Sequence, residues 1–413
     1  MSDTKIGKLW HKLSHVERWT VCLWAFMLVV SLVRVGISPE KHSVYPNFTE
    51  AASRWVHGSD LYAARGSYDF RYSPIVAIGF TPLLPLGNRY GGMVWCILST
   101  GLLVASIAYW LKAGTPRRLS GQERGAVFLL MLPLAIGNIA SNQTNALVLA
   151  MLLVAITAVQ TKWFTTASLA IVGAFLFKLY PLSLGLILIL IYPRKMSGKL
   201  LLLIIAGFLL PFLFQRTAYV KTTYRNWGHY LTVEDRSTAG PDRAYRDFQF
   251  LLHDLSLPIA QKTYRTLELA VATAFGAFCL IARLKHWPSA RLNFFAFTLA
   301  ICWMTVFGPA TESMTYLLAA PVVCWLLIAA HFSRPSWTWY LYLLSYLLLL
   351  YPPFAGMFGS HTVFRNPRLK SIQPLAVLLL LAGTLIDAMR SQRVPLAGDI
   401  TTAYNLSPDA PAL

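Results

Sequence analysis

The chain has 413 residues, of which 56% are hydrophobic and only 13% are charged. Soluble domains carry about 25% charged residues, so this composition excludes an ordinary soluble enzyme and a disordered chain. Apolar runs long enough to cross a bilayer recur along the sequence, and the alternating pattern of an outer-membrane barrel is absent. The predicted fold is therefore an all-α, polytopic membrane helix bundle with about eleven to thirteen transmembrane helices.

The formal net charge of +19 would suit a nucleic-acid-binding protein, but most basic residues fall in short turns between apolar runs. The positive-inside rule places basic residues in such turns on the cytoplasmic side. Lys5, Lys8 and Lys12 precede the first apolar run, which is too long for a signal peptide and has no cleavage site after it. We therefore expect a retained membrane anchor and an N-terminus in the cytoplasm.

The sequence predicts one membrane domain with two flanking segments. These are a cytoplasmic segment over residues 1–18, the integral-membrane domain over 19–390, and a flexible cytoplasmic tail over 391–413. Alternation of the spans puts three long loops outside, at 37–73, 215–262 and 353–371. Segment 74–87 is short and broken by prolines, which is typical of a re-entrant or half span.

The cysteines all fall within apolar runs, and none is spaced for metal binding or redox chemistry. We expect small core residues, with no disulfide framework and no zinc site. They are Cys22, Cys96, Cys279, Cys302 and Cys324.

The first outer loop combines acids with many aromatic residues. Residues 46–56 suggest an amphipathic helix at the membrane interface, with Asn47 or Thr49 as its N-cap and Gly58 at its end. A carboxylate partly desolvated near the bilayer surface can act as a general base. The candidates for that role are Glu50, Asp60 and Asp69, and for each of them a plain solvated loop acid is the alternative.

Three further elements on the same predicted side could carry chemistry. In the amide-rich turn Ser141–Ala146, Gln143 and Asn145 could bind sugar hydroxyls or a phosphate, or could only cap helices. Lys178, in the F-K-L-Y-P segment, either pairs with a phosphate or an acid or extends to the interface. Glu312 lies between two apolar spans and is either functional or a partner for a basic residue.

The sequence has no Walker loop, no dinucleotide-binding fingerprint and no H-E-x-x-H motif. An enzyme with this sequence would therefore take its activated substrate from the membrane. Basic residues in the outer loops run against the positive-inside rule and could hold an anionic head group. Besides Lys178, the candidates are Arg225, Arg365 and Arg368.

The ordered motifs resemble those of glycosyltransferase family 87. They are G-x-x-L-Y at 58–62, F-x-Y-x-P at 70–74 running into T-P-L-L-P-L, N-Q-x-N at 142–145 and F-K-x-Y-P at 177–181. Each motif is weak alone, but their order and shared side of the membrane are specific. The resemblance covers roughly residues 20 to 390 of the chain. This family consists of integral-membrane, C-type glycosyltransferases, among them polyprenol-phosphate-mannose-dependent mannosyltransferases of bacterial envelopes.

The resemblance implies inverting transfer of a hexose, with mannose favoured, from a polyprenyl-phosphate donor to a lipid or envelope-glycan acceptor. The enzyme would be a multi-pass protein of the bacterial plasma membrane, with cytoplasmic termini and its site at the outer face. An acid of the first outer loop would deprotonate the acceptor, and Lys178, Arg225, Arg365 and Arg368 would stabilise the leaving phosphate. The residues expected to bind substrate are Tyr62, Tyr72, Gln143, Asn145, Tyr180 and Glu312.

One position departs from the family pattern. The family's first-loop acid is usually an aspartate shortly before the interfacial helix, and that position falls at 42–44, where no acid occurs. Glu40 lies just before it and Glu50 just after, and Glu50 ranks first among the three loop candidates. No metal-ligand cluster is visible, although the abundance of outer carboxylates leaves a divalent cation open.

Two other classes of function remain alternatives. A polyprenyl-linked glycan flippase or polymerase would share the charge layout. A secondary transporter would suit the number of spans but usually needs ionisable residues near the midplane. The spans here hold almost no such residues: Arg34 and Asp387 lie near span ends, and Glu268 lies within one span. The polar groups gather on one side instead, which favours an enzyme facing one compartment.

Overall fold

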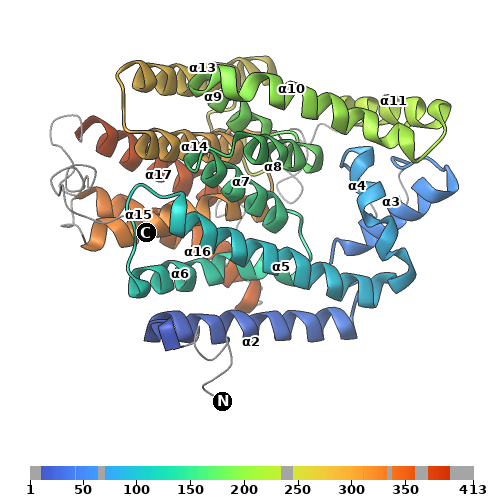
Figure 1. Ribbon diagram of the computed structural model, residues 1–413, viewed down its shortest axis with the longest axis horizontal. Coiled ribbons are helices and arrows are strands. Elements are labelled where there is room, and N and C mark those ends of the chain that lie inside the picture. The colour runs from blue at the N-terminus through green and yellow to red at the C-terminus, as the bar shows by residue number, and fades with distance from the viewer. Residues whose placement is uncertain are drawn as a thin grey trace, which may run out of the picture.

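The computed structural model describes residues 11–41, 43–63, 70–233, 245–309, 311–332, 337–358 and 371–390. Within these ranges every regular element is a helix (Figure 1). Eight helical segments of this part are long and apolar enough to cross a membrane, and three shorter apolar helices accompany them. The prediction of an all-α, polytopic membrane bundle is confirmed.

The first part of the chain comprises α2 (His15–Ile37), α3 (Tyr45–His57), α4 (Pro74–Phe80), the 3-10 helix η1 (Thr81–Leu86), α5 (Gly87–Ala113), α6 (Gly121–Ala140), α7 (Asn145–Gln160), α8 (Phe164–Phe177) and α9 (Leu182–Ile191). The second part comprises α10 (Pro193–Leu209), the 3-10 helix η2 (Leu210–Leu213), α11 (Thr217–Val233), α12 (Phe248–Asp254), α13 (Gln261–Leu284), α14 (Ser289–Val306), the 3-10 helix η3 (Ser313–Ala319), α15 (Ala320–Phe332), α16 (Trp337–Phe358) and α17 (Ile372–Arg390).

Helices α7 and α14 form the centre of the bundle. Helix α7 packs against α5 and α8, and most side chains of both α7 and α14 are buried. The peripheral helices α2, α10 and α13 instead expose large apolar residues such as Trp19, Leu202 and Leu269. A helix that is apolar all round and exposed on one side is typical of a bundle surrounded by lipid.

Helices α3, α4 and α11 lie together at one end of the bundle, on the right in Figure 1, which we call the α3 end. An aromatic cluster holds α3 against α4 and α5. In it Phe48 stacks on Phe80 with ring centroids 4.5 Å apart, and Trp95 lies 4.7 Å from Phe80. Such contacts anchor α3, which is too short to span a bilayer.

The ends of α3 follow the sequence only in part. Gly58 ends the helix in the left-handed conformation, at φ +68°, as predicted. The predicted N-cap is wrong, because α3 begins at Tyr45 after Val44 and has no side-chain cap. The Thr49 hydroxyl lies one turn inside the helix, 2.6 Å from Asn88 Oδ1 on the first turn of α5.

The proline-broken segment after α3 forms a seven-residue α4 and the 3-10 turn η1 before α5 begins. Pro82 and Pro85 cannot donate helical hydrogen bonds, so the chain tightens to 3-10 geometry there. Because α4 packs on α3, this break keeps both short helices at the α3 end.

Two ion pairs lie at the opposite end of the bundle, and one of them joins α2 to α6. Ser14 and Glu17 form a capping box on α2, and Glu17 also contacts Arg124 at 2.9 Å. Arg117 pairs with Glu123 at 2.6 Å in the same way on α6. Glu17 and Glu123 thus cap helices and hold neighbouring segments together, which explains the charged residues at this end of the bundle.

Four of the cysteines are buried and all five are free thiols. Cys22 was predicted in the core but is exposed on the surface of α2. The sequence pattern could not separate the two faces of α2 because both faces are apolar.

Candidate active site

Four segments that are far apart in the sequence meet at the α3 end. Arg71 and Tyr72 precede α4, Asn145 begins α7, and Lys178 follows α8. Glu312 precedes η3. Each of these positions lies where a helix starts or stops, so the side chains can gather at one level of the bundle.

Local sequence explains why Lys178 leaves its helix. It is the C-cap of α8 and has an extended backbone, with φ −146° and ψ 139°. Pro181 lies three residues further on, and the residue directly before a proline, here Tyr180, disfavours helical geometry. The chain therefore breaks between α8 and α9, and the Lys178 ammonium reaches across to α7.

A chain of amides fixes the position of that ammonium. Lys178 Nζ donates to Asn145 Oδ1 at 2.7 Å, and Asn145 Nδ2 donates to Asn138 Oδ1 at 3.1 Å. Asn138 Nδ2 in turn donates to the carbonyl of Met314 at 3.0 Å. Asn138 and Asn145 are both fully buried. The relay joins the α6–α7 turn, the α8–α9 turn and η3 into one rigid unit.

Asn142 shapes the turn that carries Asn145. Its backbone adopts a left-handed conformation at φ +55°, which asparagine tolerates better than most residues. The Gln143 backbone N–H then donates to the carbonyl of Asn138 at 2.9 Å, which closes the turn. The motif therefore does both things considered from the sequence. Its backbone closes the turn between two helices, and its Asn145 side chain belongs to the polar cluster.

Glu312 is held at the start of η3 by a capping box. The Thr315 backbone N–H donates to the Glu312 backbone carbonyl at 2.9 Å and also takes part in the capping box with the Glu312 side chain, while the Glu312 N–H donates to Thr315 Oγ1 at 3.3 Å. Arg71 Nη1 lies 3.5 Å from Glu312 Oε1. The Glu312 side chain is still 47% exposed, so part of the carboxylate faces open space.

Arg246 approaches Glu312 from a different part of the chain. Its backbone N–H donates to the carbonyl of Thr311 at 2.8 Å, and its carbonyl accepts from the Tyr316 hydroxyl at 2.6 Å. Its guanidinium donates to Gln373 Oε1 at 3.2 Å, and its charge acts on Glu312. The two backbone bonds of Arg246 thus hold Thr311, just before η3, and Tyr316, within η3.

Positive charge is in excess in the described part of this cluster, where three cations act on the Glu312 carboxylate: Arg71, Lys178 and Arg246. Burial lowers the pKa of Lys178 to about 8; Glu312 opposes this shift and Arg71 adds to it. A bound anion would relieve the repulsion between Lys178 and Arg71. The arrangement is thus suited to binding a phosphate.

Aromatic residues form one wall beside the cluster. The Tyr72 hydroxyl accepts from Thr144 at 3.3 Å, and the Tyr62 hydroxyl donates to the Tyr72 carbonyl at 2.9 Å. Burial raises the pKa of the Tyr62 and Tyr180 hydroxyls, so both stay neutral hydrogen-bonding groups. Tyr180 is within 3.4 Å of Asn145 Oδ1.

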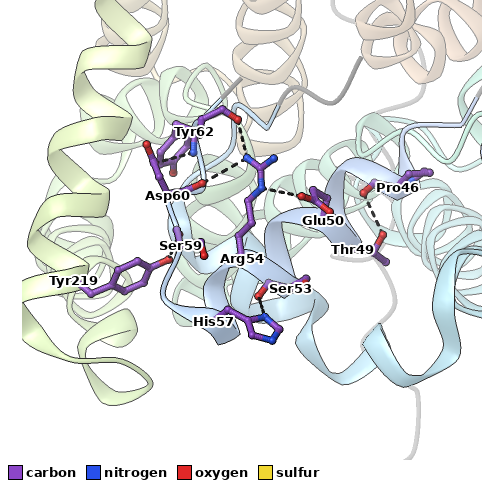
Figure 2. Close-up of polar contacts among 11 residues, drawn as sticks. Pro46, Thr49, Glu50, Ser53, Arg54, His57, Ser59, Asp60, Tyr62 and Tyr219 are labelled. Carbon is purple, nitrogen blue, oxygen red and sulfur yellow. Dashed lines mark hydrogen bonds and ion pairs between the residues drawn. The ribbon is translucent and has the colours of Figure 1, made fainter. Parts of the chain in front are cut away.

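The acids of the first loop have other partners (Figure 2). Glu50 pairs with Arg54 at 2.9 Å, and Arg54 donates to the carbonyl of Ala63 at 2.7 Å and lies 3.4 Å from the carbonyl of Asp60. The Asp60 carboxylate accepts from the Tyr62 N–H at 3.0 Å. These contacts tie the loop after α3 to the helix.

The structure brings together five of the residues predicted from sequence: Tyr72, Asn145, Lys178, Tyr180 and Glu312. It connects Tyr62 to them through Tyr72. Arg225 is exposed on α11 and Gln143 takes part through its backbone. Asp69, Arg365 and Arg368 lie outside the described residues, as do residues 1–10 and 391–413.

Sequence reasoning missed three members of the cluster. Arg71 stands directly before Tyr72 within the F-x-Y-x-P motif, and Asn138 lies 7 residues before Asn145, on the other side of the α6–α7 turn. Both could have been found from their spacing to residues already singled out. No motif flanks Arg246 in its long loop, so the sequence gives no signal for it.

No group of three or more His, Cys, Asp or Glu side chains able to hold a metal ion occurs in the described part of the chain. Two comparisons with known proteins bear on function. A model of glycosyltransferase family 87 matches residues 70–309, which is more than half of the chain. The match begins beside Arg71 and takes in the amide relay and Lys178. No curated protein matches the chain.

Proposed function

The chain belongs to glycosyltransferase family 87, and on that premise we propose that it moves a hexose from a polyprenyl-phosphate donor to a lipid or envelope-glycan acceptor. Mannose is the sugar we propose. The chain is a membrane glycosyltransferase with several apolar helices; its donor, sugar and acceptor are the proposal. The observation that supports it most is the three-cation cluster at the end of an apolar bundle.

Among the contributions to catalysis of this reaction, the largest is stabilisation of the negative charge on the leaving phosphate. When the bond between sugar and phosphate breaks, negative charge grows on the phosphate oxygens, and preorganised cations lower that barrier. Lys178 and Arg71 are held for this role by Asn145 and Glu312. Arg225, Arg365 and Arg368 remain further proposed phosphate ligands.

A lipid-linked donor also fits the surroundings of the cluster. A polyprenyl chain is apolar and stays in the bilayer, while its phosphate seeks cations at the interface. The exposed apolar faces of the peripheral helices put lipid beside the bundle. Tyr62, Tyr72, Gln143, Asn145 and Tyr180 would then bind sugar hydroxyls. An acid accepts the proton of the acceptor, with Glu50, Asp60 and Asp69 as the proposed first-loop candidates.

We place the protein in the bacterial plasma membrane, with both termini in the cytoplasm and the α3 end outside. The distribution of basic turns supports this orientation. A cysteine at Ser59, introduced in a Cys22→Ser background, should react with a membrane-impermeant maleimide added to whole cells. A cysteine at Arg118 should react only after permeabilisation, and the reverse pattern would contradict the orientation.

Transfer of radiolabelled mannose from polyprenyl-phosphate mannose into membrane lipid and glycan tests the activity. Membranes that contain the protein should incorporate label, and membranes with Lys178→Met should incorporate far less. If membranes with the wild-type protein transfer no sugar from any polyprenyl-phosphate donor, a flippase, polymerase or transporter becomes the better account.

A further inference from the structure

Among the described residues, Glu312 is the acid whose charge acts on all three cations of the cluster. Its carboxylate is fixed by the Thr315 N–H and faced by Arg71, yet nearly half of the side chain is exposed. Its negative charge favours the charged forms of Lys178 and Arg246. It is therefore a preorganised carboxylate that a substrate hydroxyl can approach next to the proposed phosphate site.

The other described acids of the predicted outer segments have structural partners. Glu40 accepts from Asn88 Nδ2 at 3.1 Å, and Asp254 accepts from Ser371 at 2.6 Å. Asp247 caps α12 and is buried. The Glu50 ion pair and the Asp60 bond to Tyr62 N–H hold the first loop.

The sequence adds a second, independent reason. At 42–44, where the family usually has its first-loop aspartate, this chain has no acid. A general base in this enzyme is therefore a carboxylate at another position of the chain. Glu312 comes from a segment far from Arg71 in the sequence, yet its carboxylate lies 3.5 Å from the Arg71 guanidinium at the α3 end.

We propose that Glu312 is the general base of this enzyme and accepts the proton of the acceptor hydroxyl. This rests on the proposed glycosyl transfer. The acceptor oxygen bonds to the anomeric carbon as the bond between that carbon and the phosphate oxygen breaks. The hydroxyl proton passes to a Glu312 oxygen, and the electron pair leaves with the phosphate as polyprenyl phosphate.

The neighbouring cations fit this role. Arg71 and Lys178 lie close enough to act on both groups, so one cluster can orient the base and the departing phosphate together. The Arg71 contact of 3.5 Å is at the outer limit of a hydrogen bond. The Arg71 contact and the capping box orient the Glu312 carboxylate, and its exposed part can accept a proton.

Glu312→Gln is the decisive variant, because the glutamine carbonyl can still accept from the Thr315 N–H and keep the cap. General-base catalysis contributes about 10²- to 10⁴-fold, so kcat should fall at least about a hundredfold. Removing one negative charge beside Lys178 and Arg71 should leave polyprenyl-phosphate affinity unchanged or tighter. A merely structural role would lower affinity and stability together. Glu40→Gln is the matched control, with the same change of charge in the same outer region.

Chemical rescue gives a second test. In Glu312→Ala, added formate should restore part of kcat, because a small carboxylate can occupy the vacated space and take the proton. The inference is overturned if Glu312→Gln keeps near-normal kcat, or if Glu50→Gln abolishes transfer while Glu312→Gln does not. Failure of the wild-type protein to use any polyprenyl-phosphate sugar would instead refute the proposed function, and the role of Glu312 would fall with it.

Discussion

Replacing Lys178 by methionine should separate chemistry from folding. The Nζ–Asn145 bond of 2.7 Å is charge-assisted, and such bonds contribute about 1.5–3 kcal/mol to stability. Methionine loses that bond, but it also removes a charge whose burial is costly, as the lowered pKa of Lys178 shows. We therefore expect the free energy of unfolding to change by no more than about 1 kcal/mol.

The effect on transfer should be much larger. A single preorganised donor aimed at developing negative charge is worth about 2.7–4 kcal/mol in mutated enzymes, or about 10²- to 10³-fold in rate. Steady-state transfer by purified protein in proteoliposomes, with donor varied, gives kcat/KM for the donor. We expect that ratio to fall by about two to three orders of magnitude in Lys178→Met.

Lys195→Met is the matched control, because Lys195 is an exposed residue on α10 whose ammonium lies over the Phe164 ring at 4.9 Å. It should keep wild-type transfer. The reasoning is refuted if Lys178→Met keeps kcat/KM within about threefold of wild type, since one transition-state contact should cost far more. It is equally refuted if the two lysine variants lose transfer to the same extent.

Three further outcomes follow from the described contacts. Since Lys178 is charged below a pKa of about 8, kcat/KM for the donor should fall as pH rises through about 8; Lys178→Arg should keep it level to higher pH. Asn138→Ala leaves buried partners unsatisfied, which costs about 1–3 kcal/mol; an unchanged melting temperature would contradict the relay. In Gly91→Ala the new Cβ would overlap the Tyr45 hydroxyl, so overpacking should cost about 1–3 kcal/mol. Gly101→Ala, with open space around it, should cost less.

The sequence predicts the helical bundle well, because apolar runs interrupted by basic turns leave few alternatives. It also predicts α3 and its end at Gly58, since glycine tolerates the left-handed conformation found there. The predicted start at 46 is close to the observed start at Tyr45, but the N-cap was wrong because packing of Phe48 and its aromatic neighbours fixes that end without a side-chain cap. The exposed Cys22 was missed because an all-apolar helix carries no sign of which face meets lipid.

The candidate site was predicted as separate motifs but not as one cluster. Asn145 and Lys178 stood out as polar residues between apolar helices, and their contact follows from neighbouring turns. The Arg71–Glu312 pair joins residues on opposite sides of the chain's midpoint, and no local pattern encodes such a pairing. Arg246 depends on the path of a long loop, which hydrophobic periodicity does not determine.

Single-turnover transfer by purified protein in proteoliposomes tests the central claim most directly. The donor would be mannosyl polyprenyl phosphate labelled in the sugar, with bacterial envelope lipid as acceptor, and both products would be followed. The account predicts that labelled glycan and free polyprenyl phosphate appear in equal amounts, and that Lys178→Met slows both together. Label that reaches the opposite leaflet while still attached to polyprenyl phosphate, without release of that lipid, would contradict it and identify a flippase.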